Sequence, residues 1–143
     1  MSGTLIVGFD ETEASHRALA FAAKTAKATG ATVHVVHVLE WSPYSFLTAQ
    51  ELEERHKRRT EELSRAAELI SAAIETLKAQ NIPVTSDVRY GHAAELICEI
   101  AEQKPDAQIV IGRAGGFAVA RRILGGMALA LIQTSPVPVT VVP

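Results

Sequence analysis

Five short apolar segments alternate with four segments of helical periodicity along the chain of 143 residues. The apolar segments are near-continuous runs, which is typical of strands that are buried on both faces of a parallel sheet. The strands are expected at Thr4–Phe9, Ala31–Leu39, Val84–Tyr90, Ala107–Ile111 and Val137–Val142, and the helices at Ala14–Thr29, Gln50–Gln80, Ala93–Lys104 and Met127–Thr134. This order predicts one α/β domain over residues 1–143, with helices on both faces of a parallel sheet.

Charge and composition argue against a broad nucleic-acid or membrane surface. The net charge is −2, the pI is about 6.2 and hydrophobic residues make up 48% of the chain, which suits an ordinary soluble core. Cys98 is the single cysteine, so an intramolecular disulfide and a cysteine zinc cluster are excluded. The first residues show neither the basic region nor the apolar region of a signal peptide, and we therefore expect a cytoplasmic protein.

A cluster of glycines follows the fourth predicted strand. Gly112 and Gly115 are followed, after nine residues, by the pair Gly125-Gly126, which opens the last predicted helix. Glycines past a strand end allow backbone N–H groups to converge on an anion, and a helix N-terminus adds further donors. A P-loop is excluded because its lysine is absent. The spacing predicts a phosphate cradle, and the alternative is a cluster that serves turn geometry and close packing alone.

Asp10 directly follows the first predicted strand. Ligands of open α/β sheets bind beyond the carboxyl ends of strands, where the winding direction reverses. If the first and fourth strands are neighbours, Asp10 and Gly112 lie in one crevice. Asp10 is also a candidate N-cap of the first helix, with Glu13 as its reciprocal partner. Arg113 either pairs with a phosphate or lies on the surface.

The remaining polar residues do not form a recognisable catalytic or metal motif. The five histidines show no i, i+4 pairing with one another, and no pair of carboxylates stands out as acid and base. His34 and His37 are three residues apart on one predicted strand, so their side chains should point to opposite faces. We therefore expect no metal site built from histidine.

Five segments in order carry a resemblance to a known family. They are Leu5–Asp10, His37–Leu39, Gly91–Glu95, Ile109–Gly116 and Ser135–Val142. With these segments the chain resembles a single-domain universal stress protein over essentially its whole length. Its glycine spacing is similar to the G-x2-G-x9-G-[S/T] signature of the family's ATP-binding branch.

The resemblance implies a Rossmann-like sheet of order 3-2-1-4-5 and a site for ATP, with Mg²⁺ shielding the phosphates. It also implies a homodimer that pairs through the last strand, residues 137–142. The implied nucleotide-binding residues are Phe9 and Asp10 near the ribose and adenine, Val38 at the adenine through its backbone, Gly112, Arg113, Gly115 and Gly116 along the phosphates, and Gly125, Gly126 and Met127 at the helix start.

One departure from the signature concerns Gly126, which stands where the family has Ser or Thr. Loss of a hydrogen bond to a charged group costs about 1.5–3 kcal/mol, or about one to two decades of affinity. The segment 117–124 is also unusually apolar for a phosphate lid. The sequence is therefore consistent with two functions. One is an ATP-binding, nucleotide-sensing stress-response protein, and the other is a dimeric interaction protein, of unknown partner, with a vestigial pocket. An ATPase is a weaker third reading, with at most slow hydrolysis.

Overall fold

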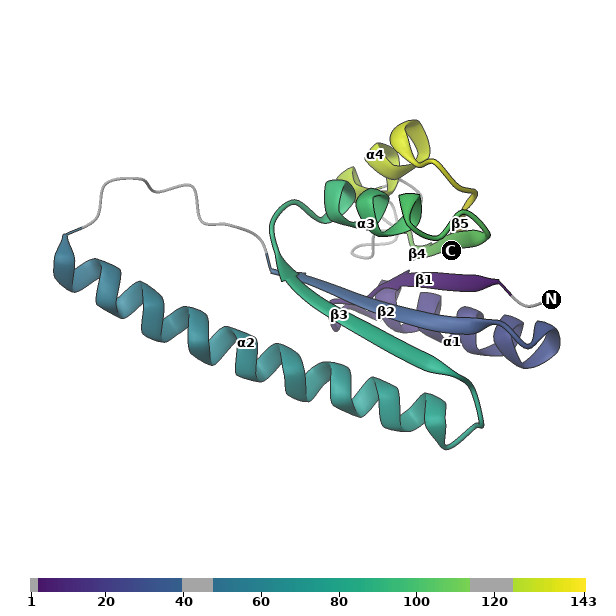
Figure 1. The fold of residues 1–143 in the computed structure, drawn as a ribbon, viewed down its shortest axis with the longest axis horizontal. Coiled ribbons are helices and arrows are strands. Elements are labelled where there is room, and N and C mark those ends of the chain that lie inside the picture. Colours follow the sequence, from purple (N-terminus) through teal and green to yellow (C-terminus); the bar gives the residue numbers. More distant parts are fainter. Residues whose placement is uncertain (1–2, 40–47, 114–124) are drawn as a thin grey trace.

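The computed structural model describes residues 3–39, 48–113 and 125–143, and it has the expected alternation of strands and helices (Figure 1). The five strands form one parallel sheet of order β3-β2-β1-β4-β5, so the predicted order is confirmed. β1 and β4 are neighbours, and the winding direction reverses between them. The elements are β1 (Thr4–Gly8), α1 (Glu13–Thr29), β2 (Thr32–Leu39), α2 (Ala49–Lys78), β3 (Val84–Tyr90), α3 (Ala93–Glu102), β4 (Ala107–Gly112), α4 (Gly126–Thr134) and β5 (Val139–Val142).

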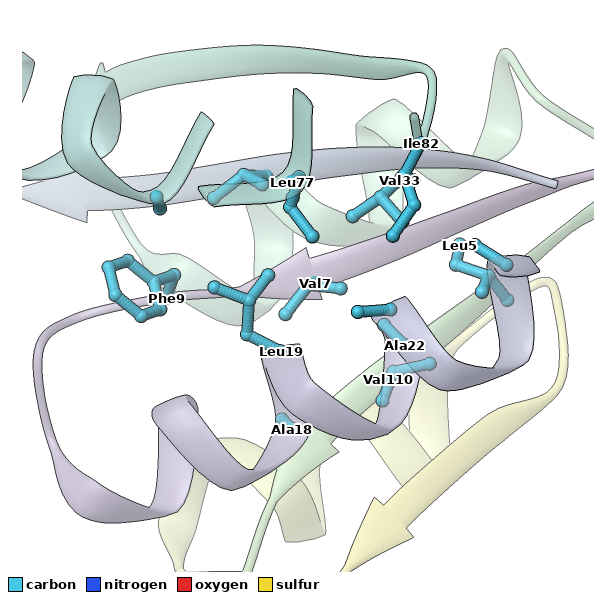
Figure 2. Close-up of a cluster of buried hydrophobic side chains, with 14 of the residues drawn as sticks. Leu5, Val7, Phe9, Ala18, Leu19, Ala22, Val33, Leu77, Ile82 and Val110 are labelled. Atoms are coloured by element: carbon cyan, nitrogen blue, oxygen red, sulfur yellow. The ribbon is translucent and has the colours of Figure 1, made fainter. Parts of the chain in front are cut away.

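Two apolar clusters hold the helices against the sheet. Alternate residues of a strand point to opposite faces, so β1 gives Leu5 and Val7 to one cluster and Ile6 to the other. The first cluster joins the sheet to α1 and α2, and the second joins it to α3 and α4. Figure 2 shows residues of the first cluster, to which α1 contributes Leu19 and Ala22 and α2 contributes Leu77, all on one face of the sheet.

The start of α1 differs from the expectation that Asp10 caps it. Thr12 is the N-cap, and its hydroxyl accepts a hydrogen bond from the Ser15 N–H (3.1 Å). Asp10 lies two residues too early, because Glu11 intervenes with a positive φ of 72°. The capping role assigned to Asp10 and Glu13 is therefore wrong. The helix ends as expected at Gly30, whose φ of 78° is favoured in glycine.

The last strand is shorter than expected. It begins at Val139 rather than Val137, and pairs in parallel with β4 from Ile109 to Gly112. Pro138 has no N–H to give to a ladder, although its carbonyl accepts a hydrogen bond from the Ile109 N–H (2.9 Å). The edge of the sheet formed by β5 is consequently a strand of four residues.

His34 is a buried polar residue on the α3 side of the sheet. Its side chain is only 7% exposed in a strand of valines, and its Nδ1 lies 2.6 Å from the Thr85 hydroxyl. The Nε2 atom is buried without a partner in the described part of the chain. Burial lowers the pKa of His34, and the positive charge of Lys104 lowers it further, so the neutral ring is favoured.

Candidate functional site

A cleft of about 720 Å³ opens beyond the carboxyl ends of β1 and β4, at the point where the winding direction reverses. This volume is typical of small-molecule sites. Residues from β1, β2, α1, α3, α4 and the segments between them share the lining. The lining residues are Gly8, Phe9, Asp10, Thr12, Glu13, Ala14, Ser15, Val36, Val38, Ala93, Ile97, Gly112, Gly125, Gly126, Met127 and Ala128.

Most of the residues predicted to bind a ligand lie around this one cleft. Arg113 is described but is absent from the lining, and its N–H donates to the Val142 carbonyl (2.8 Å) as a continuation of the β4–β5 pairing. Its role toward phosphate stays a prediction. Gly115 and Gly116 fall outside the described residues. The predicted residues that line the cleft are Phe9, Asp10, Val38, Gly112, Gly125, Gly126 and Met127.

Phe9 contributes little of its ring to a ligand. The side chain is 3% exposed and belongs to the core cluster beneath α1 and α2, where Figure 2 places it near Leu19. Its ring also meets the ring of His16 edge-on, with 5.0 Å between centroids. Phe9 therefore positions the backbone at the end of β1 rather than stacking on a base.

Asp10 is held by the turn that joins β1 to α1. Its Oδ1 accepts hydrogen bonds from the Thr12 N–H (3.1 Å) and the Thr12 hydroxyl (2.7 Å). Its own N–H donates to the Ser15 hydroxyl (3.3 Å). The carboxyl group is exposed at the rim of the cleft, and Oδ2 makes no hydrogen bond within the described residues. Because Oδ1 holds the carboxylate in place, Oδ2 can accept a hydrogen bond from a ligand hydroxyl.

Several lining residues were missed by reasoning from the sequence. Thr12 and Ser15 could have been found, because Asp-x-Thr before an apolar helical stretch is typical of an Asx turn followed by an N-cap. Ala93 and Ile97 gave no signal of their own. They reach the cleft because α3 packs beside β1 and β2, a contact that depends on the whole fold.

Three helix N-termini border the cleft, and they differ in their suitability for an anion. α1 is capped by Thr12 and has Glu13 in its first turn, and α3 has Glu95 in its first turn. α4 has no acidic residue in its first turn and no side-chain cap. Its first ladder bond runs from the Leu129 N–H to the Gly125 carbonyl (3.0 Å), so the N–H groups of residues 126–128 precede the ladder. α4 is therefore the end best suited to a phosphate.

Gly112 is required for packing. A Cβ at this position would overlap the Ala14 carbonyl oxygen in the first turn of α1. By contrast, a Cβ at Gly126 would have nothing within 4 Å among the described residues. Of the two roles considered for the glycines, phosphate binding and close packing, close packing thus applies to Gly112, because the absence of a Cβ lets α1 approach the end of β4. Gly126 is exposed, with open space around it among the described residues.

The backbone of Val38 offers an edge toward the cleft that has no partner among residues 3–39, 48–113 and 125–143. The Val36 carbonyl accepts a hydrogen bond from the Phe9 N–H (2.9 Å), so Val36 directs its peptide groups toward β1. Val38, two residues further on, directs its groups the same way. The β1–β2 register ends at Gly8 and Val36, so Val38 lies beyond it. One N–H and one C=O on the same residue match the paired acceptor and donor of an adenine edge.

The described residues contain no group of three or more histidine, cysteine, aspartate or glutamate side chains that could hold a metal ion. The cleft carries the carboxylates of Asp10 and Glu13 and the hydroxyls of Thr12 and Ser15. Among the described residues, no helix is both long and apolar enough to cross a membrane.

Comparison with known proteins agrees with this architecture. The model of the universal stress protein family matches residues 1–143. A universal stress protein of Thermus aquaticus, encoded 3′ of a QAH/OAS sulfhydrylase, is 32% identical over 143 residues, which cover 99% of each chain. UspA from Lactobacillus plantarum superimposes with a TM-score of 0.84 at 19% identity, covering 99% of this chain and 97% of its own. The universal stress protein from Archaeoglobus fulgidus in complex with dAMP gives a TM-score of 0.64 at 18% identity, covering 100% and 98%. The chain therefore belongs to the universal stress protein family.

Proposed function

We propose that this universal stress protein binds an adenine nucleotide, ATP in the first instance, in the cleft between β1, β4 and α4. It acts as a nucleotide-sensing module of a stress response, in which occupancy of the cleft biases contact with a protein partner. Such a switch needs a nucleotide that binds one state of the protein more tightly than the other.

The observation that carries the proposal is the uncapped N-terminus of α4 on a cleft at the switch point of the sheet. It supplies N–H donors and a positive dipole end for phosphate. Across the cleft, Val38 supplies a backbone edge for the base and Asp10 a carboxylate oxygen for a ribose hydroxyl. The Archaeoglobus fulgidus protein was solved with dAMP, which supports an adenine nucleotide as the ligand class.

The test is a calorimetric titration of deoxyadenosine, dAMP and ATP, the last with and without Mg²⁺, into the purified protein. We expect saturable binding, with higher affinity for the nucleotides than for the nucleoside that lacks a phosphate group, because α4 recognises the phosphate. Equal affinity for deoxyadenosine and dAMP, which differ only in the phosphate, would contradict the role of α4. Absence of heat for every nucleotide at two temperatures would refute the proposal.

The same protein is proposed to form a homodimer through its edge strand. The residues of β5 are half-buried and apolar apart from Thr140, and an apolar edge favours pairing with another strand. Pairing can run over the four residues Val139–Val142, because Pro138 and Pro143 flank them. We expect light scattering to give twice the chain mass of 15.3 kDa, about 31 kDa. A mass of 15.3 kDa at micromolar concentration would contradict the dimer.

An interaction protein with a vestigial pocket is the second candidate. Gly126 favours it, because the exposed start of α4 offers no hydroxyl to a phosphate. In that case the protein would still dimerise, while the titration with nucleotides would give no heat.

A further inference from the structure

We infer that His37 is a positioning residue for the cleft: its ring ends the pairing of β1 with β2 one hydrogen bond early, and so leaves the Val38 backbone free for a ligand. The part that concerns a ligand rests on the proposed nucleotide binding. The part that concerns the strands stands on the apo protein alone.

The regular ladder predicts a bond that the structure lacks. In parallel pairing, a residue whose N–H donates to one residue of the neighbouring strand accepts at its C=O from the N–H two residues further on. The Phe9 N–H donates to the Val36 carbonyl (2.9 Å), so the Phe9 carbonyl should accept from the Val38 N–H. No hydrogen bond joins these two groups.

The His37 side chain occupies that carbonyl instead. Its Nδ1 lies 2.6 Å from the Phe9 carbonyl oxygen. A carbonyl oxygen only accepts, so Nδ1 must carry the proton and donate it. His37 lies between Val36 and Val38 on the face of the sheet that packs against α1 and α2. The bond therefore draws the Phe9 carbonyl toward that face and away from the Val38 N–H.

The hydrogen bond from His37, in place of one from the Val38 N–H, shapes the loop that carries Asp10. Phe9 is fixed by its N–H, by its carbonyl and by the edge-on contact of its ring with His16. The chain then leaves the sheet through Glu11, whose φ of 72° is unusual for a residue with a Cβ. A β1 strand that continued alongside β2 would cover the Val38 edge. His37 thus keeps the base side of the cleft open.

The first experiment follows amide hydrogen exchange of the apo protein by NMR. In the parent protein, the Val38 amide should exchange much faster than that of Val36, which lies within the β1–β2 register. In His37→Val the Phe9 carbonyl becomes free to accept from Val38, and the Val38 amide should slow by at least about tenfold. His37→Asn should behave like the parent, because its side-chain N–H₂ can replace Nδ1 as the donor. His34→Val is the matched control, since it makes the same change on the opposite face of the same strand.

Three results of the exchange measurement would overturn the inference. A Val38 amide that is already as protected as that of Val36 in the parent would overturn the inference, and so would unchanged exchange of Val38 in His37→Val. Equal slowing in His34→Val would overturn it too, because the effect would then belong to strand stability in general.

The second experiment compares dAMP affinity among these variants. His37→Val should bind about five- to tenfold more weakly than the parent, as expected for one lost hydrogen bond. His37→Asn should restore most of the affinity, and His34→Val should leave it unchanged. Equal affinity in His37→Val and the parent would overturn the role toward the ligand. If the parent itself binds no nucleotide, the proposed function fails, while the exchange measurement still decides the role of His37 in the strands.

Discussion

Gly112→Ala should destabilise the protein by about 2–3 kcal/mol, as expected for overpacking against an element that cannot move freely. The added Cβ would overlap the carbonyl oxygen and carbon of Ala14, which are backbone atoms in the first turn of α1. Relief requires a shift of α1 away from β4, which loosens apolar contacts of Ala18 and Val110. Urea unfolding followed by circular dichroism measures the change, read as a lower midpoint at an unchanged slope.

Gly126→Ala is the matched control. It adds the same methyl group at a glycine where a Cβ meets nothing within 4 Å in the described structure. Alanine also favours the helix more than glycine does, so this variant should be neutral or stabilised by up to about 1 kcal/mol. Equal stability of the two variants would show that α1 adapts to the added methyl group without cost, and that Gly112 is not needed for packing.

Much of the fold was predictable from the sequence because strand burial leaves a strong pattern. β2 reads as a near-continuous apolar run, and all the predicted elements appear with bounds that shift by one or two residues. The strand order had a weaker basis in the pattern, which could not decide whether β1 and β4 are neighbours. The family resemblance supplied that order, and the structure confirms it.

The predictions of the α1 N-cap and of the start of β5 were wrong because local backbone geometry outweighed the pattern of residue types. Asp10 and Thr12 are both good N-cap residues by type, and the choice depends on the positive φ of Glu11, which the sequence does not signal. β5 begins at Val139 instead of the predicted Val137 because Pro138 lacks an N–H. Pro138 is visible in the sequence, but the prediction gave more weight to the valines on either side of it.

The location of the candidate cleft was predictable from the sequence, but the contacts around it were less so. The glycines and Asp10 indicated the end of the sheet at which the cleft lies, because parallel strands place their carboxyl ends along one edge. The hydrogen bond of His37 to the Phe9 carbonyl could not be foreseen, since it depends on the register of β1 against β2. Opposite faces for His34 and His37 followed from strand geometry alone, and this is confirmed.

Gly126→Ser should raise nucleotide affinity by about one to two decades. Gly126 is the first residue of α4 and lines the cleft, and a Cβ there meets nothing within 4 Å in the described part of the chain, so a serine side chain fits without moving these neighbours. Its hydroxyl would join the N–H groups at the start of the helix, and a hydrogen bond to a charged group contributes about 1.5–3 kcal/mol. Calorimetric titration of ATP and dAMP into both proteins gives the ratio of dissociation constants.

Gly126→Ala separates the hydroxyl from the general effect of a side chain. Both substitutions order the first turn of α4, because each replaces a glycine in a helix. A gain confined to serine assigns the effect to a hydrogen bond with phosphate. An equal gain in both variants assigns it to a better ordered helix start, and the missing hydroxyl then has no bearing on affinity. If serine creates binding that the parent lacks altogether, the pocket of this chain is vestigial through Gly126 alone, because the rest of the cleft is the same in both proteins.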